Sequence, residues 1–263
     1  MVDPTRLTPP SLDISFDLAP PTVDVVCQTL RYGEHPEQVA DLWLPPGAGP
    51  HPVVVSIHGG YFQQQYRRDL HDPMARALVA TGLAVLNIEY RRARAGGAFE
   101  TTTGDVMAAI SLVQQRSELS PRVGVVGHSA GGYLALWAAS HPDVDLVVAL
   151  APTADLVDCV RGGYDGGSVA AWLGGTPASD PDIYQQADLT RRFPTRAASH
   201  LMHAVDDLTV PLHQSERYVE LARAAGDDSR LHRLDRGGHF EVIEPGTDAF
   251  TDWHAIMTGW ANQ

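Results

Sequence analysis

The sequence predicts a single α/β domain built on a mostly parallel β-sheet. Short, continuous apolar runs such as VVVSI (53–57) and LAVLNIEY (83–90) are typical of strands that are buried on both faces. Segments with helical spacing separate these runs, and a short alternation of strand and helix indicates parallel strands with right-handed crossovers. The length of 263 residues suits one such domain, and an apolar fraction of 44% supplies its core.

The N-terminal part precedes this alternation. Residues 1–21 are rich in proline and polar residues and predict an extended arm. The segments 23–33 and 38–46 then predict the two strands of a hairpin, because the second alternates apolar and polar residues.

From residue 53 onward the alternation is regular. Further strands are predicted at 53–57, 83–90, 122–127, 146–152, 199–207 and 230–235, and helices at 69–82, 102–116, 130–141, 215–226 and from 248. The alternation stops between Thr153 and Pro194, where Gly and Asp turns are mixed with Trp172 and Tyr184. A long irregular insertion in a compact domain is usually functional, so residues 153–194 predict a cap or lid on one domain that spans 1–263.

The composition argues against several classes of protein. A net charge of -13 disfavours a nucleic-acid partner, since phosphate binding needs clustered Lys and Arg. No apolar run approaches the roughly 20 residues of a membrane helix, and the N-terminus lacks the pattern of a signal peptide. Cys27 and Cys159 are too few for a disulfide framework, so a cytoplasmic location is the simplest expectation.

The strongest motif is Gly127-His128-Ser129-Ala130-Gly131, a G-x-S-x-G pattern. It follows a predicted buried strand and opens directly into a predicted helix, which is the context of a nucleophile elbow. Such a tight turn needs glycine on both sides and presents the serine hydroxyl at the carboxyl edge of the sheet. Ser129 is therefore the candidate nucleophile, and the alternative is a serine that caps the helix.

A serine needs a base, and the base needs an orienting carboxylate. His239 is the best placed of twelve histidines, because it follows a late strand through Gly237 and Gly238. Asp206 and Asp207 come directly after the apolar strand segment SHLMHAV (199–205), and either can orient His239. The resulting chain order of Ser, Asp and His is the order found in α/β-hydrolases.

From about residue 22 onward the chain resembles an α/β-hydrolase of the esterase/lipase type. The motifs that carry this resemblance are HGGYF (58–62), EYRR (89–92), GHSAGG (127–132), D-x-x-V-P (207–211) and GGHF (237–240). The resemblance implies the α/β-hydrolase fold, with an eight-stranded, twisted and mostly parallel sheet that is flanked by helices and carries a small cap insertion. It also assigns the catalytic acid to Asp207, although Ala204 stands where the family commonly has glycine, so Asp206 stays an alternative.

The resemblance further implies an oxyanion hole. One donor is the N–H of Ala130, and the other comes from the glycine-rich loop at Gly60 or Tyr61, where glycine lets the backbone approach closely. His58 is expected to brace that loop and not to act as a base. No H-E-x-x-H or similar spacing accompanies it, so we expect neither a metal nor an organic cofactor.

The motif HGG followed by an aromatic pair is similar to the corresponding motif of small bacterial carboxylesterases and of kynurenine formamidases. Phe62, Tyr133, Trp172 and Phe240 are candidates for the substrate pocket, with core packing as the alternative for each. The predicted function is a serine hydrolase that cleaves carboxylic esters of small to medium acyl groups through an acyl-enzyme. An arylformamidase with the same triad and a non-catalytic small-molecule-binding protein are the alternatives. The resemblance is compatible with a homodimer, but no residue requires one.

Overall fold

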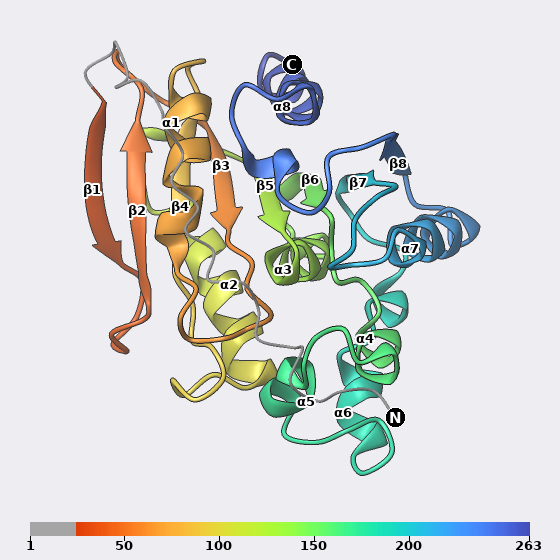
Figure 1. Ribbon diagram of the computed structural model, residues 1–263. Helices are drawn as coiled ribbons and strands as arrows, with labels where there is room; N and C mark the ends of the chain where they lie inside the picture. Colours follow the sequence, from red (N-terminus) through yellow and green to blue (C-terminus); the bar gives the residue numbers. More distant parts are fainter. Residues whose placement is uncertain (1–24) are drawn as a thin grey trace.

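A twisted eight-stranded sheet runs through the protein in the order β1-β2-β4-β3-β5-β6-β7-β8 (Figure 1). The structure is a computed structural model and describes residues 25–263, so the arm predicted for residues 1–21 lies outside the described residues. The strands are β1 (Val26–Arg31), β2 (Val39–Leu44), β3 (His51–Ile57), β4 (Ala84–Ile88), β5 (Leu119–His128), β6 (Val144–Leu150), β7 (Ala198–Ala204) and β8 (Ser229–Leu234). Strand β2 pairs antiparallel with β1 and β4, and all other pairs are parallel. The predicted mostly parallel sheet of eight strands is confirmed.

Helices cover both faces of the sheet, because the central strands are apolar on both sides. Val53 and Val55 of β3 belong to one buried cluster, whereas Val54 belongs to the other. The first cluster packs under α2 (Phe99–Val113), α3 (Ala130–Ala138) and α7 (His213–Ala224), and the second packs under α1 (Asp72–Val79) and α8 (Asp248–Ala261). Helix α2 begins three residues before the predicted position.

The connections place a topological switch beside β3. The chain leaves β3 through α1 to β4 on one side and then returns through α2 to β5 on the other side. Ligands of α/β proteins bind at the carboxyl ends of the strands at such a switch. The fold therefore directs a site to the ends of β3 and β5.

The insertion between β6 and β7 is helical, whereas the sequence indicated an irregular stretch. It contains α4 (Leu156–Gly162), α5 (Ser168–Leu173), α6 (Pro181–Gln186) and a 3-10 turn at Leu189–Arg192. These helices have six or seven residues each, which is too short for a visible amphipathic repeat. Figure 1 shows them gathered beyond the carboxyl ends of the central strands. The predicted cap thus lies over the edge where the fold directs a site.

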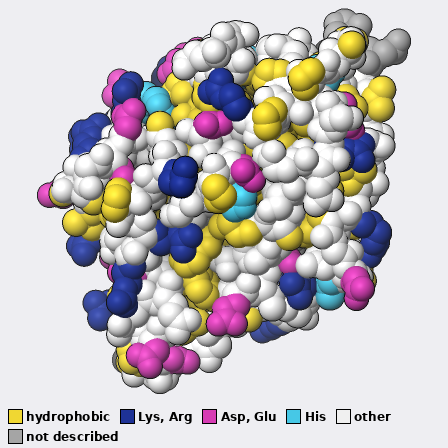
Figure 2. Space-filling model, turned by 180° about the vertical axis from the view of Figure 1, so that it is seen from behind, with side chains coloured by type: hydrophobic (Ala, Val, Ile, Leu, Met, Phe, Trp, Pro, Cys, Tyr) yellow, Lys and Arg dark blue, Asp and Glu magenta, His cyan; other side chains and the backbone are white. Residues whose placement is uncertain are grey.

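The surface carries charges of both signs. Figure 2 shows acidic and basic side chains interspersed over one face, with hydrophobic side chains gathered in a hollow near its centre. Among residues 25–263, no helix is both long enough and apolar enough to span a bilayer.

Candidate active site

Ser129 occupies a strained turn between β5 and α3. Its φ of 56° and ψ of -118° lie outside the common regions for a residue with a side chain. A Cβ at Gly127 would lie 2.1 Å from the carbonyl oxygen of Gly131, and a Cβ at Gly131 would lie 2.1 Å from that of Ile57. Both glycines are therefore sterically required. Ser129 makes no side-chain cap to α3, which argues against the helix-cap alternative.

His239 and Asp207 form a hydrogen-bonded pair. The Nδ1 atom of His239 lies 2.7 Å from Oδ2 of Asp207, and both residues are buried. The other carboxylate oxygen accepts hydrogen bonds from the N–H groups of Thr209 (2.7 Å) and Val210 (2.9 Å). Burial alone would raise the pKa of Asp207, but hydrogen bonds from His203 and His239 outweigh burial and hold the pKa below its usual range. Asp207 is thus an ionised acceptor that fixes the ring of His239.

Asp206 has a different partner. Its side chain is exposed, and Oδ1 accepts a hydrogen bond of 2.8 Å from the N–H of Gly238. Asp206 and Asp207 therefore hold one loop at two points, and only Asp207 contacts the imidazole of His239. We name residues 235–240 the GGH loop.

Parallel strands bring the three candidate triad residues to one edge of the sheet. Ser129 follows β5, Asp207 follows β7, and His239 follows β8. His128, the residue before Ser129, connects the serine turn to His239, because its Nε2 lies 2.8 Å from the carbonyl oxygen of His239. The two imidazole rings are 4.6 Å apart. The serine turn and the GGH loop are thus direct neighbours.

The loop after β3, residues 58–62, lies against the serine turn and is named the HGG loop. A Cβ at Gly59 would lie 2.7 Å from the carbonyl oxygen of His128 and 3.0 Å from Cβ of Ser129. Gly60, Tyr61 and Phe62 all have positive φ, at 110°, 48° and 58°. The backbone N–H groups of Gly60, Tyr61 and Ala130 find no acceptor among residues 25–263. These N–H groups are thus free of acceptors in the described part of the chain, as the predicted oxyanion hole requires.

A buried ionic network holds the HGG loop from behind. Nε2 of His58 lies 2.8 Å from Oε1 of Glu89, and Nδ1 lies 2.8 Å from the carbonyl oxygen of Gly59. The same Glu89 oxygen pairs with Arg92 at 2.8 Å. Tyr90 stacks on His58 with ring centroids 4.4 Å apart and donates a hydrogen bond to its carbonyl oxygen. His58 thus braces the loop, as expected. The role of Glu89 and Arg92 was not predicted, although both belong to the EYRR motif.

Three of the four aromatic candidates for the substrate pocket are core residues in this structure. Phe62, Tyr133 and Trp172 are at most 1% exposed, and Phe62 stacks on Trp172 at 3.7 Å. The polar groups of the other two are occupied, because Tyr133 donates to the carbonyl of Ala187 and Trp172 donates to Thr102. This arrangement favours the packing alternative, in which the cluster fixes the cap on the body. Phe240 differs, since it is half-buried beside His239 at 5.0 Å between ring centroids.

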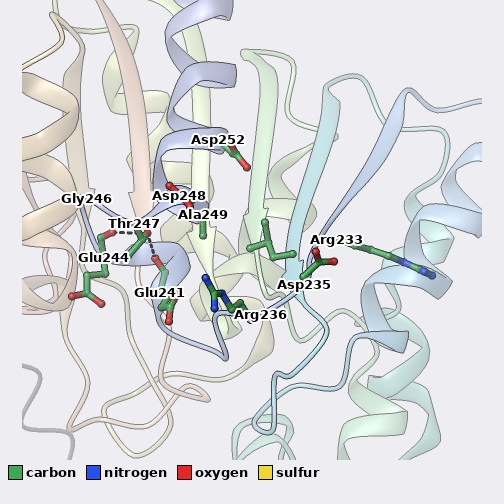
Figure 3. Close-up of a pocket in the computed structure, with 11 residues that line it drawn as sticks. Arg233, Asp235, Arg236, Glu241, Glu244, Gly246, Thr247, Asp248, Ala249 and Asp252 are labelled. Carbon is green, nitrogen blue, oxygen red and sulfur yellow. Dashed lines mark hydrogen bonds between the residues drawn. The ribbon is translucent and has the colours of Figure 1, made fainter.

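A separate pocket of about 570 Å³ is lined in part by Asp235 and Arg236 of the GGH loop (Figure 3). It lies between the end of β8, the 3-10 turn Glu241–Ile243 and the start of α8. Its lining is mainly charged: Arg233, Arg236, Asp235, Glu241, Glu244, Asp248 and Asp252. None of the candidate triad residues lines it. In the part of the chain that the structure describes, no group of three or more His, Cys, Asp or Glu residues could hold a metal ion.

Comparisons with known proteins agree with this architecture. A truncated carbohydrate esterase from gut microbiota has a TM-score of 0.82 at 18% identity, with 95% of this chain and 100% of that chain covered. Esterase B from Lactobacillus rhamnosis has a TM-score of 0.77 at 19% identity, with 91% and 87% covered. At these identities the likeness shows the fold, which confirms the α/β-hydrolase prediction.

Curated relatives match only in part. The 5-methylorsellinic acid synthase of Aspergillus terreus is 32% identical over 117 residues, which is 38% of this chain. The chain spans 4–6% of the length of the curated relatives that it matches. The sequence model of one family matches residues 40–221, which include Ser129 and Asp207. The chain therefore belongs to the BD-FAE family.

Proposed function

We propose that this protein is a serine esterase that hydrolyses carboxylic esters through an acyl-enzyme intermediate. The observation that carries the proposal is the strained turn of Ser129, which lies against the HGG loop at Gly59. The next two N–H groups of that loop, at Gly60 and Tyr61, have no acceptor among residues 25–263. Strain of this kind in a residue with a side chain is typical of a functional position. The Asp207–His239 pair at the same edge of the sheet supplies the base that a serine nucleophile needs.

The proposed reaction uses these groups in two steps. The Oγ atom of Ser129 attacks the ester carbonyl carbon while Nε2 of His239 takes its proton, and Asp207 stabilises the imidazolium. The N–H groups of Gly60, Tyr61 and Ala130 are the proposed donors to the oxyanion. Collapse of the tetrahedral intermediate releases the alcohol, which receives the proton from His239. A water molecule, activated by His239, then hydrolyses the acyl-enzyme and restores Ser129.

The proposed substrates are esters of small to medium acyl groups. This proposal is supported by the position of helices α4, α5 and α6, which lie beyond the carboxyl ends of the central strands (Figure 1). Half-buried Phe240 beside His239 is the aromatic candidate best placed to contact a substrate. The similarity to a carbohydrate esterase supports testing acylated sugars in addition to simple esters.

The test of this proposal is Ser129→Ala. With 4-nitrophenyl acetate and butyrate as substrates, kcat should fall at least about a thousandfold, because loss of a triad member removes nucleophilic catalysis. Asp235→Asn, on the exposed flank of the GGH loop, is the control and should keep wild-type turnover. A fluorophosphonate probe should label the wild type and not Ser129→Ala. Absence of labelling in the folded wild type would favour a non-catalytic binding protein.

A second candidate function uses the same triad on an amide. The candidate is an arylformamidase that acts on N-formyl-kynurenine or a related aryl formamide, and it rests on the similarity of HGG and its following aromatic pair to the motif of kynurenine formamidases. Comparison of kcat/KM for that substrate with kcat/KM for 4-nitrophenyl butyrate separates the two functions. Higher kcat/KM for the formamide would replace the esterase assignment.

A further inference from the structure

The GGH loop has few connections to the rest of the protein. Gly237 and Gly238 have φ of 134° and 55°, in the region that favours glycine, so the loop turns sharply after β8. Among residues 25–263, only three hydrogen bonds connect this loop to elements beyond it and its following turn. One is the His239–Asp207 pair, and the other two hold the loop backbone.

The first backbone contact comes from His128. The carbonyl oxygen of His239 can only accept, so the Nε2 atom of His128 at 2.8 Å must carry a proton and donate it. His128 is 4% exposed and stands at the end of β5, which pairs with β3 and β6. It is also the residue immediately before Ser129. One rigid side chain thus sets the position of the base relative to the nucleophile.

The second backbone contact comes from the opposite side of the loop. Asp206 accepts the N–H of Gly238 at 2.8 Å, and it precedes Asp207, which accepts from the ring of His239. Burial lowers the pKa of His128 well below its ordinary value and thus favours the neutral imidazole, whose single proton the contact with the carbonyl of His239 places on Nε2. The peptide groups on either side of the Gly238–His239 segment are therefore both held: the N–H of Gly238 from the end of β7 and the carbonyl of His239 from the end of β5.

We propose that His128 and Asp206 are positioning residues that clamp the backbone on both sides of His239 and thereby hold its imidazole in line with Ser129 and Asp207. The expected loss of turnover rests on the proposed esterase function. The positioning of His239 by the two hydrogen bonds does not depend on that function. Neither residue touches the reacting atoms in the proposed mechanism. A displacement of about 1 Å in a catalytic group can cost about a hundredfold in rate, so two hydrogen bonds of this kind have a measurable effect.

Paired substitutions test the clamp. His128→Leu removes the donor, whereas His128→Gln retains an amide N–H at a similar reach. We expect kcat for 4-nitrophenyl butyrate to fall about 10- to 100-fold in His128→Leu and less than about threefold in His128→Gln, with KM little changed in both. Asp206→Ala should lower kcat about three- to tenfold, and Asp206→Asn, which retains an acceptor oxygen, should restore most of it.

A control separates positioning from general loss of core packing. His71 is buried, lies 6.4 Å from His128 between ring centroids, and bonds to Ser56 and not to the GGH loop. His71→Leu should lower the thermal midpoint as much as His128→Leu but keep kcat within about threefold. Because Asp206 is exposed, its variants fold even where a core variant does not.

A spectroscopic measurement tests the clamp without turnover. The Nδ1–H proton of His239, bonded to Asp207, gives a deshielded proton resonance that Asp207→Asn identifies by its loss. This resonance should broaden or vanish in His128→Leu and Asp206→Ala and persist in His128→Gln and His71→Leu. An unchanged resonance with unchanged kcat in His128→Leu and Asp206→Ala overturns the clamp. Absence of ester turnover in the wild type overturns the proposed function. In that case an unchanged resonance in both variants still overturns the clamp, and a broadened or lost resonance supports it.

Discussion

The HGG loop and the GGH loop contain the same residue types in opposite order, yet the protein holds them differently. The HGG loop turns its histidine inward, where His58, Glu89 and Arg92 form a network that is at most 1% exposed. The GGH loop has an exposed flank and, among the described residues, three hydrogen bonds to elements beyond its following turn. In the proposed mechanism the first loop contributes backbone N–H groups and the second contributes the side chain of His239. A loop that offers its backbone needs an immobile backbone, whereas a side chain that exchanges protons needs its ring oriented.

The largest expected effect concerns the orientation of that ring. Asp207→Asn should lower kcat about 10³- to 10⁴-fold, because an amide can donate to Nδ1 and favour the wrong tautomer of His239. Steady-state turnover of 4-nitrophenyl butyrate measures the effect, and Asp235→Asn on the same loop is the matched control. A tenfold loss or less would assign the orienting role elsewhere.

The second effect should appear in stability. Glu89→Gln leaves His58 and Arg92 without their buried carboxylate, and breaking a buried ion pair typically costs about 3–5 kcal/mol. Urea unfolding should show a loss in this range, together with reduced turnover. Glu241→Gln is the matched change beside the GGH loop. It is exposed and should stay within about 0.5 kcal/mol of wild type. Equal losses in the two variants would remove the distinction between the loops.

The sequence predicted the sheet and the candidate triad because both depend on local patterns. Buried strands read as apolar runs, and the elbow reads as G-x-S-x-G between a strand and a helix. The cap helices were not predicted, since six- or seven-residue helices such as α5 show no complete period. The site support was not predicted either. The contacts of Glu89 with His58 and of His128 with His239 join residues 31 and 111 positions apart, and only the folded topology brings them together.

The aromatic residues show the same limit. Phe62, Tyr133 and Trp172 read equally well as a pocket or as a core, because composition does not tell which way a ring points. The fold buries all three between the body and the cap. The acidic pair by itself did not separate Asp206 from Asp207, so the assignment to Asp207 came from the resemblance. The structure gives the two residues different partners.

The third effect compares one glycine from each loop. In Gly59→Ala the new Cβ would lie 2.7 Å from the carbonyl oxygen of His128, so the backbone of the HGG loop or the serine turn must shift. We expect a loss of about 1–3 kcal/mol in stability and a clear fall in kcat. Gly238→Ala meets no atom within 4 Å, and its cost is only the positive φ of 55°, about 1–2 kcal/mol. If Gly238→Ala lowered kcat more than Gly59→Ala, the GGH loop would be the less tolerant of the two.

The last effect concerns protonation behind the HGG loop and is small above pH 6. His71 is buried near His58 and His128 and bonds to Ser56, and burial lowers its pKa from 6.5 to about 3. Between these values the unfolded chain binds a proton at this residue and the folded protein does not. Stability therefore falls as the pH drops from about 6.5 toward 3, by about 1.4 kcal/mol per pH unit for this histidine.

His71→Gln should be less stable at pH 8 and should lose less stability on acidification. His213→Gln, at an exposed position, should keep the wild-type dependence of stability on pH. Urea unfolding at pH 8, 6 and 5 gives these slopes, and an unchanged slope in His71→Gln would place the acid sensitivity outside this part of the core.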